Sequence, residues 1–156
     1  MITPDPNERL LLRQAFRKPT YLTVRTTSDG FDVADGHYDE LQGTILRASL
    51  ARKLFRDGFL TCSSSDGVHG DEGKLCAQCQ HALCQPRLRL QLLAQRAVLY
   101  VLELPATSAE NFFALEERAR REGADLIDCT VRLTVIDRGH WGEVAFERVS
   151  HPNPTP

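Results

Sequence analysis

The sequence lacks a strong excess of charge of either sign, and it lacks any long apolar run. Its 156 residues include 19 Lys and Arg against 21 Asp and Glu, a formal net charge of -2. This balance excludes a histone-like protein that coats nucleic acid by bulk charge, so any nucleic-acid site must be a local patch. No apolar stretch reaches membrane-spanning length, and the amino terminus lacks the basic and apolar segments of a secretory signal. We therefore expect a cytoplasmic protein without membrane contact.

Familiar catalytic motifs are also absent. The chain contains no P-loop, nucleophile elbow, dinucleotide fingerprint or H-E-x-x-H pattern. His69 and Asp71, upstream of Cys76, faintly resemble the zinc deaminase signature, but the required Glu and Pro are missing. We therefore expect a non-enzymatic protein. Because 42% of the residues are hydrophobic and 26% are charged, residues 1–149 are expected to fold as a single domain, followed by a flexible tail at residues 150–156.

Apolar periodicity predicts a mainly β fold with one long helix. The helix starts near Thr107, which lies three residues before Glu110 as in a capping box, and it ends at Gly123. Residues 7–18 suit a short amino-terminal helix, and a polar loop is expected around Gly36. Residues 42–55 fit neither period cleanly, so a strand that becomes irregular is expected there. Strand patterns occupy residues 21–27, 42–55, 87–104, 129–136 and 143–149. Within the third strand region, residues 87–92 and 97–104 form two strands or one long strand with a break near Gln95.

The order of these elements predicts the architecture. One helix between the third and fourth strands is the order of a small Greek-key barrel of the OB type. An unrelated α+β sandwich is the alternative. A cysteine-rich insertion at about residues 60–86 would precede the third strand region.

Four of the five cysteines cluster between Cys62 and Cys84. Cys76 and Cys79 form a C-x-x-C turn, which supplies two adjacent ligands to a tetrahedral ion, and Cys62 and Cys84 would complete a four-cysteine site. Residues 63–73 are too polar to form a core element, so a structural zinc ion is expected to order them. An iron–sulfur cluster, a redox pair and free core cysteines are the alternatives. Cys129 is interpreted as a core thiol.

Positive and aromatic side chains predict a nucleic-acid surface. Arg87 and Arg89 alternate on one strand face, and no acidic residue lies between Gln85 and Arg96. Arginines at alternate positions of a strand suit a phosphate backbone, although a merely solvated face is the alternative. Trp141, the only tryptophan, lies in a glycine-containing hairpin turn, where it either stacks on bases or packs against the domain. The candidate nucleic-acid-binding residues are Tyr21, Arg52, Lys53, Arg87, Arg89, Arg138 and Trp141.

Several segments carry a family resemblance. They are Leu-Pro-Ala-Thr-Ser-Ala-Glu-Asn-Phe at residues 104–112, Thr-Val-Arg-Leu at 130–133 and Glu-Val-Ala-Phe-Glu at 143–147, together with Ser-Ser-Asp-Gly at 64–67 before the cysteine cluster. Over about residues 60–147 the chain resembles OB-fold-like single-strand DNA-binding proteins and recombination factors of phages and integrative elements. The resemblance implies binding of single-stranded DNA without sequence preference, or docking to a recombinase.

Two hypotheses follow from the sequence. The first is a zinc-stabilised OB-like module that binds single-stranded DNA through arginines on a strand and through aromatic side chains that stack on bases. The second is a zinc-stabilised protein-interaction subunit of a larger nucleic-acid-processing or mobile-element complex. Neither fixes the oligomeric state, so a homo-oligomer stays open, as does the preference between DNA and RNA.

Overall fold

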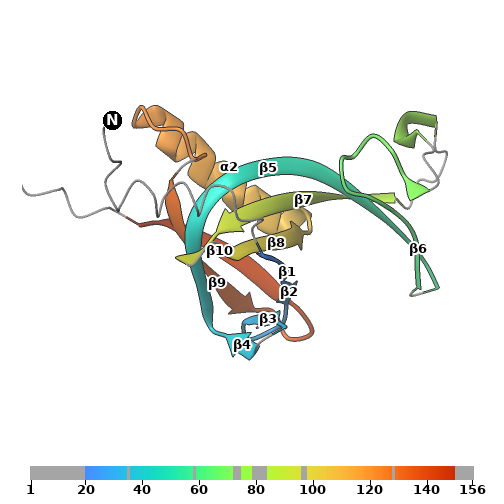
Figure 1. Cartoon of the computed structure of the whole chain (residues 1–156), viewed down its shortest axis with the longest axis horizontal. Helices are drawn as coiled ribbons and strands as arrows, with labels where there is room; N and C mark the ends of the chain where they lie inside the picture. Colours follow the sequence, from blue (N-terminus) through green and yellow to red (C-terminus); the bar gives the residue numbers. More distant parts are fainter. Residues whose placement is uncertain are drawn as a thin grey trace, which may run out of the picture.

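The fold is a curved mixed β-sheet with one long helix packed on it (Figure 1). A computed structural model of the chain describes residues 20–34, 36–57, 59–71, 75–78, 84–95, 98–127 and 129–149. The expected helix at residues 7–18 and the tail at 150–156 lie outside this part. No helix among the described residues is long and apolar enough to cross a bilayer. The elements are β1 Thr20–Thr23, β2 Arg25–Thr26, β3 Phe31–Val33, β4 Gly36–Tyr38, β5 Glu40–Arg56, β6 Phe59–Ser64, the 3-10 turn η2 Cys76–Gln78, β7 Cys84–Leu93, β8 Val98–Leu104, α2 Ala106–Arg121, β9 Thr130–Asp137 and β10 Gly142–Arg148.

The long strand β5 organises the main sheet. It pairs with β7 along one edge, and along the other edge it pairs first with β9 and then with β6. The expected change to an irregular segment is wrong, because β5 is one strand of 17 residues that arches over the molecule (Figure 1). The pairing with β7 skips Leu46 of β5, and the pairing with β6 skips Thr61 of β6. The extra residue Leu46 offsets the alternation of side chains along β5, so its apolar residues fit no single period.

The helix α2 covers one face of the sheet. Phe112 and Leu115 are buried there in a core that includes the leucines of β7 and β8. The predicted cap is wrong: the helix begins after Pro105, and no side chain caps its first turn. Ser108, the residue after the predicted cap Thr107, instead contacts the edge strand β10. Its hydroxyl accepts a hydrogen bond from the Val144 N–H at 2.9 Å.

The strands do not close into the predicted barrel. The path through the main sheet runs β1-β8-β7-β5-β9-β10, so β1 and β10 end it within the described residues. β1 pairs with β8 in parallel, and the Val24 N–H continues this ladder with a bond to the Val101 carbonyl. β1 thereby occupies the edge of β8 that closure would require. The expected polar loop around Gly36 is also wrong, since β2, β3 and β4 form a small sheet there that buries Phe31 and Val33.

Candidate nucleic-acid interface

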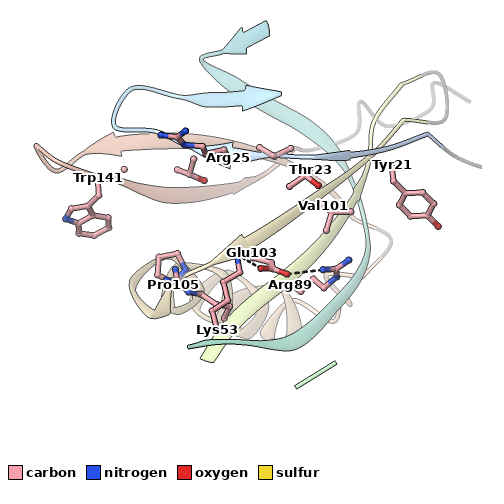
Figure 2. A pocket seen from close by; sticks show the side chains of 13 residues that line it. Tyr21, Thr23, Arg25, Lys53, Arg89, Val101, Glu103, Pro105 and Trp141 are labelled. Atoms are coloured by element: carbon pink, nitrogen blue, oxygen red, sulfur yellow. Dashed lines mark hydrogen bonds and ion pairs between the residues drawn. The ribbon is translucent and has the colours of Figure 1, made fainter. Parts of the chain in front are cut away.

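A groove of about 620 Å³ lies on the sheet face opposite α2, between the first strands and the central ones. Its floor is formed by β7, β8 and the end of β5, and its wall by β1 and β2. The turn between β9 and β10 closes one end. Figure 2 shows Trp141 at that end and Tyr21 at the other, with the charged side chains between them.

The floor of the groove carries three cations and one carboxylate. Arg87 and Arg89 lie two residues apart on β7 and so share a face. Glu103 on β8 pairs in register with Arg89, and its carboxylate oxygens lie 3.0 Å from an Arg89 Nη atom and 2.6 Å from Lys53 Nζ. Arg87 binds the Gln85 side chain, and its Nε is buried without a hydrogen-bond partner among the described residues. Glu103 therefore forms ion pairs with Lys53 and Arg89 but not with Arg87.

The alternation of side chains along a strand explains which residues form the wall of the groove. Tyr21, Thr23 and Arg25 are two residues apart along an extended segment, so their side chains point to the same side, whereas Val24 between them is buried. Tyr21 is 62% exposed, and Arg25 makes no ion pair within the described part of the chain. Thr23 and Arg25 were missed from the sequence, although the period-two pattern that starts at Tyr21 contains them.

The end of the groove is a rigid turn that carries an exposed indole. The Arg138 N–H donates to the Trp141 carbonyl at 3.0 Å, and the Asp137 carboxylate accepts from the Gly139 N–H at 2.8 Å. A Cβ at Gly142 would collide with the backbone carbonyl that follows β2, so the turn is seated closely against this segment. The side chain of Trp141 is nevertheless 42% exposed. The turn therefore presents the indole to the groove.

The structure brings most of the sequence-predicted contact residues together. Two of them stay outside the groove. Arg138 forms an ion pair with Glu143 at 3.3 Å, and Arg52 donates from Nε to the Gly67 carbonyl at 3.3 Å. The predicted residues that line the groove are Tyr21, Lys53, Arg87, Arg89 and Trp141.

The cysteine cluster is only partly described. Cys62 on β6 and Cys84 on β7 both pair in register with Leu54, which lies between them on β5. Two strand spacings put their Cα atoms about 10 Å apart. Among the described residues no group of three or more His, Cys, Asp or Glu side chains is arranged to hold a metal ion, and Cys79 lies outside those residues. Zinc binding by Cys62, Cys76, Cys79 and Cys84 therefore stays a prediction.

The loop after β6 has internal order of its own. One Asp66 oxygen accepts hydrogen bonds from the backbone N–H groups of Val68 and His69, each at 2.8 Å, and from the Ser64 hydroxyl at 3.0 Å. The other oxygen lies 3.0 Å from His69 Nδ1. Residues 64–69 thus have local hydrogen bonds of their own, and the ordering of residues 63–73 by zinc stays a prediction. The sequence signal was Ser-Ser-Asp-Gly, in which aspartate binds the backbone that follows it.

These hydrogen bonds predict the pH dependence of the loop. The backbone N–H of His69, followed by its side chain, holds the pKa of Asp66 well below the usual value of 3.8. A lowered carboxyl pKa stabilises the loop fully above this usual value, and the stabilisation declines as the pH falls below it. We expect Asp66→Asn to speed amide exchange at Val68 and His69 near neutral pH. Asp71→Asn is the matched control, and equal exchange in both variants would contradict this role of Asp66.

The groove brings together four cationic side chains, Arg25, Lys53, Arg87 and Arg89, and the exposed rings of Tyr21 and Trp141. Guanidinium and ammonium groups can bind phosphate oxygens, and exposed rings can stack on bases. No protein-family model, curated protein sequence or solved structure matches the chain.

Proposed function

We propose that the groove binds single-stranded DNA and that the protein is a non-enzymatic binding module. The observation that carries the proposal is the convergence of four cations and two exposed aromatic rings on one groove, from four separate parts of the chain. Exposed rings suit unpaired bases, because stacking needs base faces that a duplex hides. Both oxygens of Glu103 are engaged by Lys53 and Arg89, which favours a binding role over a catalytic one.

The strand order supports an OB-like classification of this module. The run β8-β7-β5-β9-β10, with α2 connecting β8 to β9, has the order 3-2-1-4-5 of the OB fold with its helix after the third strand. In OB folds the face of strands 2 and 3, with the loops after strands 1 and 4, takes oligonucleotides. The groove lies over the corresponding strands β7 and β8, and Trp141 belongs to the loop after β9. In this classification β1 occupies the edge of β8 that would otherwise pair to close the barrel.

The experiment that tests the proposal uses the single tryptophan of the chain as its probe. We expect Trp141 fluorescence to change on titration with a thymidine oligonucleotide and to change less with a duplex of equal length. Contacts to two to four phosphates predict a slope of log affinity against log salt of about -1.4 to -2.8. No binding at low salt, or a preference for duplex, would refute the proposal.

A substitution at Glu103 makes the same experiment more specific. Because its carboxylate neutralises Lys53 and Arg89, Glu103→Gln is expected to bind the oligonucleotide several-fold more tightly and with a steeper salt slope. Glu110→Gln, a change of equal charge on α2 away from the groove, is the matched control. An equal gain in both variants would mean that only net charge matters.

A further inference from the structure

Two arginines of the groove have no carboxylate partner among the described residues. Glu103 binds the other two cations, whereas Arg25 on the wall and Arg87 on the floor form no ion pair in that part of the chain. Within it, Arg87 donates to the exposed side chain of Gln85 at 3.1 Å, and its Nε has no acceptor. A guanidinium without a carboxylate partner suits an anionic ligand, because its fork of donors matches phosphate oxygens.

Both of these arginines lie at the end of the groove that carries Trp141. Arg87 comes directly before Leu88, whose register partner is the last residue of β8. Arg87 is therefore level with Pro105, the residue that follows β8. Figure 2 shows Pro105 on the floor and Arg25 on the wall, each nearer to Trp141 than to the opposite end of the groove. The two free guanidinium groups thus approach the same end from two sides.

The groove is asymmetric in charge along its length. Toward Tyr21 it is lined by the uncharged side chains of Thr23 and Val101. The charge of Arg89 is neutralised by Glu103 at 3.0 Å. A strand that runs through a groove carries one charge per phosphate at even spacing, so it does not call for free positive charge at one end only.

The turn that carries Trp141 packs directly on the wall at this end. A Cβ at Gly142 would collide with the carbonyl of Thr27, the residue that follows β2. The wall and the turn therefore meet, and the exposed indole lies at their junction, on the same side of the groove as Arg25 (Figure 2). An indole in this position can cover the last base of a strand, whose outer face has no stacked neighbour.

We propose that the Trp141 end of the groove binds the phosphorylated end of a single DNA strand. A terminal phosphomonoester carries about -1.5 to -2 charges and three acceptor oxygens, whereas a phosphodiester within the strand carries one charge. Arg25 contacts these oxygens from the wall and Arg87 from the floor, and the terminal base stacks on Trp141. This inference rests on the proposed function, because it concerns the same groove.

Competition binding with three thymidine oligonucleotides of equal length tests the inference. One carries a 5′ phosphate, one a 3′ phosphate, and one has hydroxyl groups at both ends. We expect one of the phosphorylated strands to bind roughly ten-fold more tightly than the hydroxyl-ended strand, because it adds charge-assisted bonds at one fixed place. The strand that gains identifies the bound end. Equal affinity of all three strands overturns the inference, and so does an equal gain at both ends, which added charge alone would explain.

Substitutions at the two arginines test the assignment of residues. Arg25→Gln and Arg87→Gln are each expected to remove most of the preference for the phosphorylated strand. Arg118→Gln, a change of equal charge at an exposed residue of α2 outside the groove, is the matched control and should keep the full preference. Circular dichroism confirms that each variant is folded. A preference that both groove variants retain overturns the inference, whereas a wild-type chain that binds none of the three strands refutes the proposed function itself.

Discussion

Trp141→Ala is expected to weaken binding of single-stranded oligonucleotide by about 5- to 150-fold, since stacking of one base on an aromatic side chain contributes about 1–3 kcal/mol. The fold should survive, because the indole is 42% exposed and the turn that carries it is held by backbone bonds. Fluorescence anisotropy of a labelled oligonucleotide measures the change without needing the tryptophan. The salt slope should stay the same, because the variant removes no phosphate contact.

A control and a second ring make this prediction specific. Phe113→Ala removes an exposed aromatic side chain outside the groove, so affinity should stay within two-fold of wild type by the size of typical surface effects, about 0.5 kcal/mol. Tyr21→Ala should weaken binding in the same way as Trp141→Ala. Because the two rings stand at opposite ends of the groove (Figure 2), their effects should add in the double variant. If Trp141→Ala and Phe113→Ala bind equally well, the indole does not stack on bases.

Much of the groove was predictable because its residues follow strand alternation. Arg87 and Arg89 obey the period of two within one uninterrupted strand, so their common face could be predicted locally. Glu103 could not be assigned in this way. It lies in a nearly continuous apolar run, and its place beside Arg89 depends on the pairing of β7 with β8. Arg52 and Lys53 adjoin in sequence, yet only Lys53 reaches the groove, because neighbouring strand residues point to opposite faces.

The fold was predictable where one element buries one face and less so where the backbone changes register. The spacing of Phe112, Leu115 and Ala119 gives the helix, and all three are buried. β5 departs from this rule because it exchanges partners along one edge and carries an extra residue, Leu46, in its pairing with β7. The small sheet of β2, β3 and β4 has strands of two or three residues, which are too short to show a period. Whether a barrel closes depends on which strand pairs with β8. This pairing joins segments far apart in the sequence, so no local pattern predicts it.

Ser108→Ala is expected to lower the free energy of unfolding by about 1–3 kcal/mol, because it leaves the buried Val144 N–H without its acceptor. Thr107→Ala is the matched control, since it makes the same kind of truncation one residue earlier on the exposed side of α2. The sequence pattern assigned the structural role to Thr107 as a cap. The structure assigns it to Ser108, so the control should change stability by no more than about 0.5 kcal/mol. Urea unfolding monitored by circular dichroism measures both variants.

Asn111 extends this prediction to a coupled pair. Its side-chain amide donates to the carbonyl of Val144, the same residue whose N–H binds Ser108, so the two side chains share one backbone unit. Losing either contact lets the Val144 backbone unit shift relative to α2, so the second loss is expected to cost less than it would alone. The double variant Ser108→Ala with Asn111→Ala should therefore lose less stability than the two single losses added together. Full additivity, or a larger effect at Thr107 than at Ser108, would show that these side chains do not anchor β10 to α2.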